Sequence, residues 1–521
     1  MAGDIILIYP PAAKPCEPPP GIARLAGALD RHGVKNRVLD ANLEGFLHLL
    51  QSPVAASDTW TRRSQRNIER NLASLRNRPA YRTPDRYKRA VMDVNRVLET
   101  ASAGSGAAVS LANYQHRGLS PVRSADLLRA AEHPAQNPFY SYFKKRLPEI
   151  LDEGRPSIIG FSLNFLGQAL CTFAMAGFLK KNFPGLTLIA GGGLVTSWMK
   201  NKSLMDRDVP HLFQGLFDHF VAGPGEKQLL SLAGISAEGE GSAPGHYTPD
   251  YGCFPAGEYL SPGFVLPYSA SNGCYWNACS FCPEKAEGNP YIPVPADRAT
   301  ADLQALAAGM DPVLVHLLDS AISPALLTAL AEKPLGVPWY GFARISRHLA
   351  DRDFCMALKR SGCVMLKLGL ESGDQDVLDS MQKGVDLKTA APALEALKEA
   401  GIATYVYLLF GTPQETLQAA RRTLAFTVEH HDRIGFLNLA IFNMPLNAPG
   451  AQDMMTGSFY EGDLSLYTDF EHPLGWSRKL VRQFLDDEFK KHAAVAGILR
   501  RDPPFFTSNH APFFVPHDEW K

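Results

Sequence analysis

The chain has 521 residues, which is enough for about three domains. With 45% hydrophobic and 20% charged residues, the composition is that of a folded protein and excludes a disordered chain. The 52 Lys and Arg balance 53 Asp and Glu, and this argues against a generally basic nucleic-acid binder. No apolar run approaches the roughly 18 residues of a membrane helix, and the first residues lack the features of a signal peptide. We therefore expect a cytoplasmic, multidomain protein without a membrane partner.

Residues 1–235 predict an α/β domain of the doubly wound, Rossmann-like kind. Short apolar runs predict strands at 4–9, 36–40, 157–162, 186–190 and 219–222, with helices at 22–32 and 166–182 between them. Strands that alternate with helices predict a parallel sheet, whose ligands bind at the carboxyl ends of the strands. The residues expected at those ends are Pro10, Pro11, Ser162, Gly191, Gly192, Gly193, Gly225 and Glu226.

A helical insertion at about residues 50–148 interrupts this alternation. Between Trp60 and Arg96 the sequence has eleven Lys or Arg, ten of them Arg, and three Asp or Glu. Such a stretch favours a solvated helical face, and the alternative is a docking site for an acidic peptide, RNA or phosphate.

The second half of the chain predicts a partial TIM-like (β/α)6 barrel over residues 263–450. Residues 236–262 are rich in Gly, Pro, Ser and Glu, which indicates a linker. Six candidate strands follow at 264–268, 313–319, 339–345, 364–370, 404–410 and 436–442, and helical stretches separate them. The active site of such a barrel lies at the carboxyl ends of the strands. Residues 451–521 form a C-terminal extension, with a helix at 480–493 and an aromatic tail at 505–510.

Three cysteines within nine residues form the motif that indicates chemistry. Cys274, Cys279 and Cys282 follow the first predicted barrel strand. A zinc site usually needs two cysteine pairs, and here only Cys279 and Cys282 have that spacing. An iron–sulfur cluster normally takes four thiolates, so three would leave one iron open to a ligand. The motif therefore predicts a cluster with one open iron, and zinc is the alternative.

This cysteine loop, placed after the first strand of six βα units, resembles that of the radical S-adenosylmethionine superfamily. The resemblance implies that three cysteines hold a 4Fe–4S cluster and that the open iron binds S-adenosylmethionine. It also implies that one-electron reduction cleaves the sulfonium of the bound S-adenosylmethionine and yields a 5′-deoxyadenosyl radical. Phe281, just before the last cysteine, matches the family's aromatic residue near the adenine. Four residues separate Cys274 from Cys279, whereas the commonest family spacing is three.

Later strand ends match the same family in the same order. The resemblance assigns the contacts with S-adenosylmethionine as follows: Asp319 and Ser320 at the amino group, Arg344 near the carboxylate or the wall of the site, Glu371 and Ser372 at the ribose, and Gly411 and Pro413 beside the adenine. The turn with Gly411 and Pro413 ends at Glu415. Two residues of these matches have plainer explanations. Glu415 can serve the first turn of a helix, and Arg344 can form a surface ion pair.

The first domain resembles the cobalamin-binding domain of cobalamin-dependent radical S-adenosylmethionine enzymes. The resemblance assigns cobalamin to Pro10, Pro11, Ser162, Gly191, Gly192, Gly193, Thr196, Gly225 and Glu226. Glycines let the backbone approach a large planar ligand. The Asp-x-His-x-x-Gly motif is absent, so the cobalt would lack a histidine from it. A domain that only packs, without a ligand, is the alternative.

Together these features predict a cobalamin-dependent methyltransferase that acts on an unactivated carbon or phosphorus centre. The resemblance implies a small-molecule or peptide substrate and an external one-electron reductant of the flavodoxin or ferredoxin type, with no nucleic acid. His316, Tyr405 and Tyr407 lie on predicted barrel strands and are candidates for a general base. The alternatives are a radical rearrangement, oxidation or cyclisation, and a zinc- or cluster-bearing protein that binds RNA or peptide.

Overall fold

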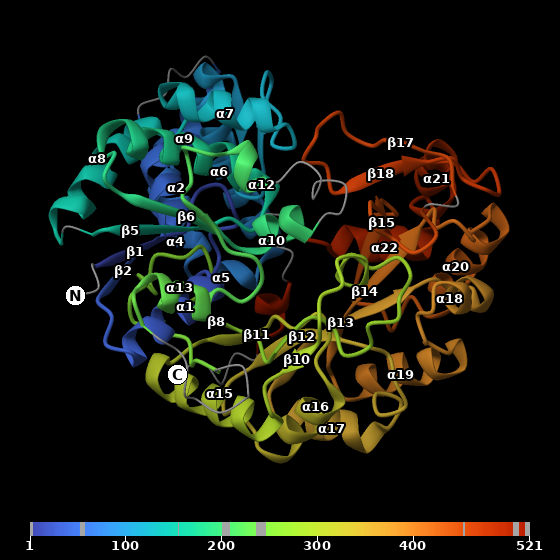
Figure 1. The fold of residues 1–521 in the computed structure, drawn as a ribbon. Helices are drawn as coiled ribbons and strands as arrows, with labels where there is room; N and C mark the ends of the chain where they lie inside the picture. Colours follow the sequence, from blue (N-terminus) through green and yellow to red (C-terminus); the bar gives the residue numbers. More distant parts are fainter. Residues whose placement is uncertain are drawn as a thin grey trace. The chain divides into compact units, whose positions relative to one another are not determined.

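A computed structural model describes residues 4–52, 58–154, 156–200, 209–235, 246–451, 454–503 and 510–515. The chain divides into two compact units (Figure 1). Unit 1 contains Met1–Phe264 and Tyr460–Leu466, and unit 2 contains Val265–Phe459 and Tyr467–Pro503 together with the residues from Asn509 onward. Within the described ranges, no helix is both long and apolar enough to cross a bilayer.

Unit 1 is built on a five-stranded parallel sheet in the order β2-β1-β5-β6-β7. Its strands are β1 (Ile5–Ile8), β2 (Asn36–Leu39), β5 (Ile158–Ser162), β6 (Thr187–Gly191) and β7 (His219–Phe220). The crossovers contain α1 (Pro20–Arg31), α9 (Leu166–Asn182), α10 (Gly193–Lys200) and α12 (Val209–Leu212), and α13 (Glu226–Leu232) follows the last strand. The chain starts at β1 in the interior of the sheet, adds β2 on one side of it and then adds β5, β6 and β7 on the other side. The predicted doubly wound topology is therefore confirmed.

The segment between β2 and β5, which contains the predicted insertion, is mostly helical, as predicted. It contains α2 (Ala41–Gln51), α3 (Thr59–Arg66), α4 (Ile68–Leu75), α5 (Arg78–Tyr81), α6 (Pro84–Ser102), α7 (Ser124–Glu132) and α8 (Tyr140–Asp152). A hairpin of β3 (Ala107–Val109) and β4 (Tyr114–His116), which the sequence did not predict, follows α6.

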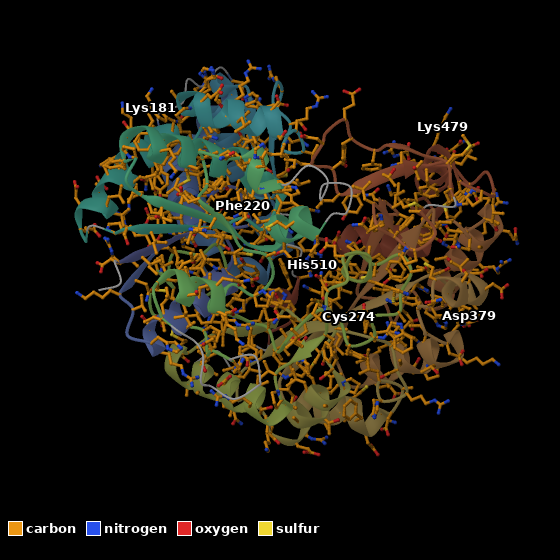
Figure 2. The ribbon with its side chains drawn as sticks, in the orientation of Figure 1. Lys181, Phe220, Cys274, Asp379, Lys479 and His510 are labelled. Carbon is orange, nitrogen blue, oxygen red and sulfur yellow. The ribbon has the colours of Figure 1, made fainter. Side chains whose placement is uncertain are left out.

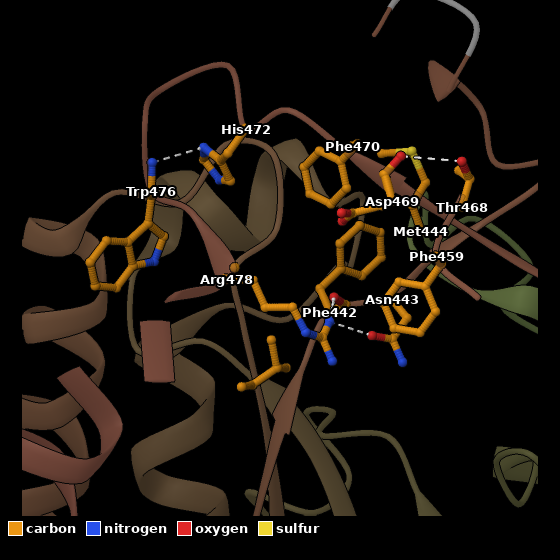
Figure 3. Close-up of a pocket in the computed structure, with 12 residues that line it drawn as sticks. Phe442, Asn443, Met444, Phe459, Thr468, Asp469, Phe470, His472, Trp476 and Arg478 are labelled. Carbon is orange, nitrogen blue, oxygen red and sulfur yellow. Dashed lines mark hydrogen bonds between the residues drawn. The ribbon is translucent and has the colours of Figure 1, made fainter. Parts of the chain in front are cut away.

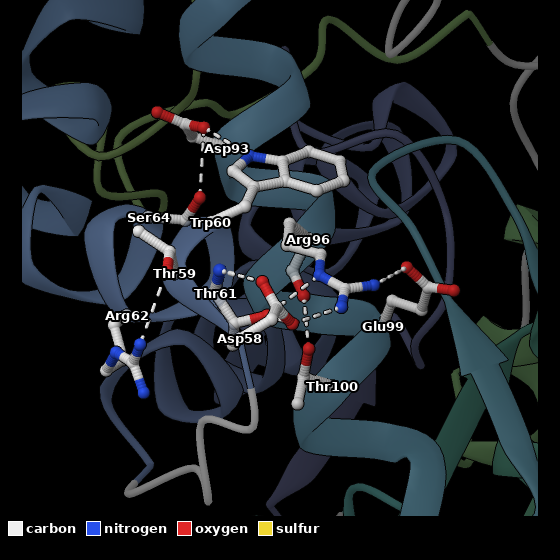
Figure 4. Close-up of polar contacts among 10 residues, drawn as sticks. All are labelled: Asp58, Thr59, Trp60, Thr61, Arg62, Ser64, Asp93, Arg96, Glu99 and Thr100. Atoms are coloured by element: carbon white, nitrogen blue, oxygen red, sulfur yellow. Dashed lines mark hydrogen bonds and ion pairs between the residues drawn. The ribbon is translucent and has the colours of Figure 1, made fainter.

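Polar side chains fasten α3 to α6 (Figure 4). Asp93 is 4% exposed and accepts hydrogen bonds from Trp60 Nε1 and Ser64 Oγ, both at 2.9 Å. Arg96 pairs with Asp58 at 2.8 Å. Part of the predicted basic stretch therefore holds the insertion together, and other arginines are exposed: Arg62, Arg66, Arg70, Arg82, Arg86 and Arg89.

Residues 246–262, predicted to be a linker, pack closely within unit 1. Tyr251 and Tyr259 are 1% and 2% exposed, and the Tyr259 hydroxyl donates to Asp40 at 2.7 Å. The amide of Asp250 donates to the carbonyl of Ala23 in α1. The buried aromatic residues explain this packing, because they supply apolar area that Gly and Pro content does not reveal.

Unit 2 is built on six parallel strands in the order β15-β14-β13-β12-β11-β8. They are β8 (Val265–Tyr268), β11 (Leu314–Leu317), β12 (Trp339–Ala343), β13 (Cys363–Glu371), β14 (Ala403–Phe410) and β15 (Phe436–Ile441). The helices between them include α15 (Ala296–Met310), α16 (Pro324–Glu332), α17 (Arg352–Arg360), α18 (Gln375–Ser380), α19 (Leu387–Glu399) and α20 (Leu417–Glu429). All six predicted strands are confirmed, and β8 and β15 are the two edges of the described sheet.

The strand register places different chemistry on the two faces of this sheet. His316 lies opposite Tyr340, and Lys367 lies opposite Phe342 and Tyr405, so these side chains share one face. Ala511 and Val515 join the apolar core on that face. Trp339 points to the other face, where its indole donates to the Ser361 carbonyl at the end of α17. The helices therefore cover the second face.

The C-terminal extension differs from the prediction of one helix at 480–493. Helix α21 (Arg478–Phe484) passes into a π-helical turn (Leu485–Phe489), and α22 (Ala493–Arg501) starts anew after His492. His492 ends the predicted helix because its side chain accepts from the Ala494 amide and caps α22. Strands β16 (Met444–Pro445), β17 (Thr456–Ser458) and β18 (Tyr467–Phe470) form a small antiparallel sheet. Residues 505–509 of the aromatic tail lie outside the described residues.

Candidate active site

The cysteine loop begins at the carboxyl end of β8 in unit 2, where Figure 2 labels Cys274. An antiparallel pair, β9 (Ser271–Asn272) and β10 (Ile292–Pro293), closes the loop at its base. Gly273 has φ +71°, and a Cβ there would lie 2.5 Å from the Pro290 carbonyl oxygen. Only glycine fits this close approach, so the base of the loop is fixed by the residue next to Cys274.

Charged and polar groups surround two of the three thiols, Cys279 and Cys282. Cys279 is 8% exposed, and Cys274 and Cys282 are half-buried. Burial raises the pKa of Cys279, whereas Lys383 and Arg344 act in the opposite direction. Burial also raises the pKa of Cys282, and the backbone N–H groups of Glu284 and Lys285 oppose the shift. Cations and N–H donors therefore face the thiolates that a cluster requires.

The donor set has the chemistry of an iron–sulfur site. Cys274, Cys279 and Cys282 are carried on one loop, and a cluster takes one thiolate on each of three irons. Among the residues that the structure describes, no group of three or more His, Cys, Asp or Glu side chains is placed to hold a metal ion. That these three cysteines bind a cluster stays a prediction.

A turn after α18 holds the cysteine loop in place, and we call it the 381–384 turn. The Ser280 amide donates to the Met381 carbonyl at 2.9 Å. Lys285 Nζ donates to the Ala278 carbonyl at 2.7 Å and to Gln382 Oε1 at 3.3 Å. Sequence reasoning missed this turn, because its residues carry no motif and lie about a hundred positions away from the loop.

Asp319 lies at the predicted strand end, and its contacts are with the start of the cysteine loop. Its carboxylate is 2% exposed and accepts from the Ala270 amide at 3.1 Å and from the Ser271 hydroxyl. Burial raises its pKa. Ser320 is exposed. A role for either residue at the amino group of S-adenosylmethionine stays a prediction, and Asp319 also acts as a tether.

Arg344 is buried beside the cysteine loop. It is 9% exposed, which excludes the alternative of a surface ion pair. Its guanidinium carbon lies 4.1 Å from the centroid of Trp276, and its Nη1 lies 4.0 Å from Cys279 Sγ. A second guanidinium nitrogen donates to the Lys383 carbonyl.

Glu371 and Ser372 end β13 and are bound to neighbouring side chains. Glu371 has φ +69° and pairs with Lys383 at 2.8 Å, with both side chains largely buried. The Ser372 hydroxyl lies 3.1 Å from Thr423 Oγ1 in α20 and accepts from the Asp374 amide. Their predicted role at the ribose stays a prediction, and Lys383 is a charged residue that sequence reasoning missed.

The turn from Gly411 to Glu415 is fastened to the C-terminal extension. Glu415 is fully buried and accepts from the Gly411 amide at 2.5 Å and from Trp476 Nε1 at 2.9 Å. Burial raises its pKa to about 7. His472 lies with Nε2 2.8 Å from the Thr412 carbonyl oxygen. The extension thus covers the turn that carries Gly411 and Pro413.

Gly411 also lines a small pocket beyond the ends of β14 and β15 (Figure 3). The pocket is lined by aromatic and polar side chains of strand ends and extension, among them Phe442, Asn443, Phe459, Asp469, Phe470 and Arg478. Phe281 of the cysteine loop packs on the apolar cluster that contains Phe442. The predicted aromatic residue and the predicted Gly-rich turn therefore approach the same group of side chains.

The three candidates for a general base share one face of the sheet. His316 stacks on Tyr340 with ring centroids 4.3 Å apart, and its Nε2 lies 3.4 Å from Lys367 Nζ. Tyr405 stacks on His510 at 4.7 Å and is fully buried. Tyr407 is half-buried, and burial raises its pKa above the ordinary value. Which of them acts as a base stays a prediction.

The residues predicted for cobalamin gather at the carboxyl edge of the sheet in unit 1. Asn164, which sequence reasoning missed, links two strand ends. Its side chain donates to Ser162 Oγ at 3.0 Å and accepts from the Gly193 amide at 2.9 Å. Thr196 Oγ1 accepts from the Gly223 amide and donates to the Gly192 carbonyl.

Other members of this predicted set are placed by different contacts. The carbonyl of Pro10 accepts from Gln168 Nε2 at 2.8 Å. Pro11 is buried. Glu226, at the start of α13 after Gly225, pairs with Arg24 of α1 at 2.5 Å. Its position at the strand end was predicted, and this ion pair was not.

Sequence comparison matches part of the second unit to a known family. Residues 268–427 match the model of the radical SAM superfamily. The hopanoid C-3 methylase of Methylococcus capsulatus is 26% identical over 288 residues, which cover 50% of this chain and 54% of that protein. The anaerobic magnesium-protoporphyrin IX monomethyl ester cyclase of Rubrivivax gelatinosus is 23% identical over 303 residues, which cover 54% of this chain and 51% of that protein. The chain spans about half the length of these curated relatives.

Structural comparison extends the likeness to nearly the whole chain. The radical S-adenosylmethionine methyltransferase TsrM from Kitasatospora setae, solved with cobalamin and a [4Fe-4S] cluster, aligns with TM-score 0.52 at 16% identity over 97% of this chain and 92% of that one. The cobalamin-dependent S-adenosylmethionine radical enzyme OxsB, solved with aqua-cobalamin, aligns with TM-score 0.55 at 11% identity over 94% of this chain and 67% of that one. Residues 268–427 therefore form a radical S-adenosylmethionine domain, and the chain has the fold of the cobalamin-dependent enzymes of that superfamily.

Proposed function

We propose that the protein is a cobalamin-dependent radical S-adenosylmethionine methyltransferase that acts on an unactivated carbon or phosphorus centre. The observation that carries the proposal is the loop with Cys274, Cys279 and Cys282 at the carboxyl end of β8, within a radical SAM domain. The likeness to the hopanoid methylase and to TsrM supports methyl transfer.

Cys274, Cys279 and Cys282 would hold the 4Fe–4S cluster, and S-adenosylmethionine would bind beside it. When bound, these groups supply a 5′-deoxyadenosyl radical, and cobalamin supplies a carrier for the methyl group. The residues of the chain itself would position these groups and shield them from water. Asp319 and the 381–384 turn fix the loop, while Phe281 and the Gly411 turn offer an apolar wall to a nucleobase.

The strand ends of unit 1 fit a large planar ligand. Gly193 is exposed at the start of α10, and Gly223 has φ +75° with no atom within 4 Å of the position of a Cβ. The aromatic side chain of Phe165 is 57% exposed beside Asn164 at the same edge. Open glycine backbone and an exposed ring are what a corrin needs from a protein surface.

The substrate would be a small molecule or a peptide, and an external one-electron reductant would be required. A half-buried phenol such as that of Tyr407, whose pKa is raised by burial, would hold a proton on the face of the sheet that it shares with His316. A second candidate function is a radical oxidation or cyclisation without methyl transfer. The likeness to the magnesium-protoporphyrin ester cyclase favours this candidate.

Product analysis tests the proposal directly. The protein is reconstituted without oxygen with iron, sulfide and hydroxocobalamin, and it receives dithionite and S-adenosylmethionine. We expect four irons per chain, a bound-cobalamin absorption spectrum, 5′-deoxyadenosine and S-adenosylhomocysteine. Formation of 5′-deoxyadenosine without S-adenosylhomocysteine would favour the second candidate, and one zinc per chain with neither product would refute both.

A further inference from the structure

The four-residue spacing between Cys274 and Cys279 gives Trp276 a defined place. Its indole Nε1 donates to the Gln382 carbonyl at 2.9 Å, although the side chain is 38% exposed. The ring lies against Gly384, where a Cβ would come 2.1 Å from Trp276 Cζ2, and Gly384 has φ +65°. The 381–384 turn is therefore shaped to receive this indole, and residue 384 must be glycine for the indole to lie there.

Trp276 in turn orients the guanidinium of Arg344. The guanidinium carbon lies 4.1 Å from the ring centroid, which is within the range of a cation–π interaction. The hydrogen bond from Arg344 Nη2 to the Lys383 carbonyl fixes the rotation of the guanidinium group, so that Nη1 lies 4.0 Å from Cys279 Sγ. Among the described residues, no carboxylate forms an ion pair with Arg344, whereas the neighbouring Lys383 is paired with Glu371. The charge of Arg344 is therefore directed at the cysteine.

We propose that Trp276 and Arg344 form a positioning pair that holds an uncompensated positive charge at the Cys279 ligand and raises the reduction potential of the cluster. The inference rests on the proposed function, since it requires the cluster. Three thiolates make the bound cluster anionic, and reduction adds one more negative charge. In a buried site a fixed cation stabilises the more negative state most. Arg suits this role because it stays protonated at any working pH.

A redox titration of the reconstituted protein tests the pair without any turnover. The cluster is titrated with dithionite and mediators in the absence of S-adenosylmethionine, and the reduced form is followed by electron paramagnetic resonance. At the wild-type midpoint potential we expect Arg344→Gln to lower the reduced-to-oxidised ratio at least tenfold, a shift of about 59 mV for a one-electron couple. Trp276→Leu shifts the potential in the same direction by less, because Arg344 loses its orientation and keeps its charge.

Two further variants separate charge from structure. Arg344→Lys keeps the charge and restores most of the wild-type potential. Arg347→Gln, an exposed arginine three residues further on, serves as the matched control and leaves the potential unchanged. The proposal is overturned if Arg344→Gln has the same midpoint potential as this control. It is also overturned if the midpoint potential of Arg344→Lys is as low as that of Arg344→Gln.

Cluster loading decides how the remaining outcomes are read. If Arg344→Gln fails to load iron, Trp276→Leu and Arg344→Lys carry the test, and wild-type potential in Trp276→Leu overturns the proposal. A wild-type protein that binds no cluster refutes the proposed function together with the inference. A wild-type protein with a cluster whose potential is insensitive to Arg344 refutes the inference alone.

Discussion

Replacing Asp319 by alanine tests whether a buried carboxylate fixes the start of the cysteine loop. The carboxylate accepts two hydrogen bonds, from the Ala270 amide and the Ser271 hydroxyl, and it is 2% exposed. Hydrogen bonds to a charged group contribute about 1.5–3 kcal/mol each, so their loss destabilises the closed loop by at least about 3 kcal/mol. Because 1.4 kcal/mol is tenfold in an equilibrium constant, loop opening increases about 100-fold.

Hydrogen exchange measured by mass spectrometry reads this opening in peptides that cover residues 270–282. We expect exchange in Asp319→Ala to be about 100-fold faster than in the wild type, with an intermediate value in Ser271→Ala, which removes one of the two bonds. Ser320→Ala is the matched control, because Ser320 is exposed and adjacent. If Asp319→Ala exchanges at the rate of this control, the carboxylate is no tether. Weakened binding of S-adenosylmethionine would then support its predicted role as a ligand.

Three further predictions concern the cluster, the Gly411 turn and the insertion. Cys279→Ala abolishes iron loading while the exposed Cys253→Ala retains it, and retained cluster absorbance would contradict the ligand assignment. Burial raises the pKa of Glu415 to about 7, so its contribution to stability is present in acid and is lost as pH rises through 7. Between pH 5 and pH 8 the free energy of unfolding of the wild type should fall by up to about 3 kcal/mol through this group, and Glu415→Gln should lack this fall. Urea unfolding at both pH values measures it, and an equal fall in the two proteins would contradict the prediction. Asp93→Ala leaves the Trp60 indole and the Ser64 hydroxyl without their acceptor, and we expect a loss of about 3 kcal/mol in urea unfolding. Glu99→Ala, which removes only an exposed ion pair, should cost under about 1 kcal/mol.

The sheets could be predicted because parallel strands buried on both faces are continuous apolar runs. Ile5–Ile8, at 0–2% exposure, has no polar position that could suggest a helix or a loop. Boundaries that depend on packing could not be predicted. The helix expected at 480–493 has amphipathic spacing throughout, yet Leu485–Phe489 takes a π-helical turn that buries Leu485 and Phe489.

The cysteines could be found from sequence, and the residues that hold them could not. Cys274, Cys279 and Cys282 form a local motif, because one loop must supply all three sulfurs. Trp276 and the 381–384 turn meet only in the folded chain, and their contact involves a carbonyl and a glycine without any side-chain motif. The positive φ of Gln382 and Gly384 is the single local feature that marks this turn.

The carboxyl end of a strand locates a polar residue at the active edge without fixing what the residue binds. Asp319, Glu371 and Ser372 all lie at predicted strand ends, yet each has a partner within the protein: the loop start, Lys383 and Thr423, respectively. The reason is physical, since a loop that carries three sulfurs must hold its shape before any cofactor arrives, and the nearest polar groups are those at the same edge. Glu371 shows how the two roles can be distinguished. If it only pairs with Lys383, Lys383→Met and Glu371→Gln should weaken the binding of S-adenosylmethionine equally, and the double variant should add nothing. A contact with the ribose would make Glu371→Gln the more damaging of the two single variants.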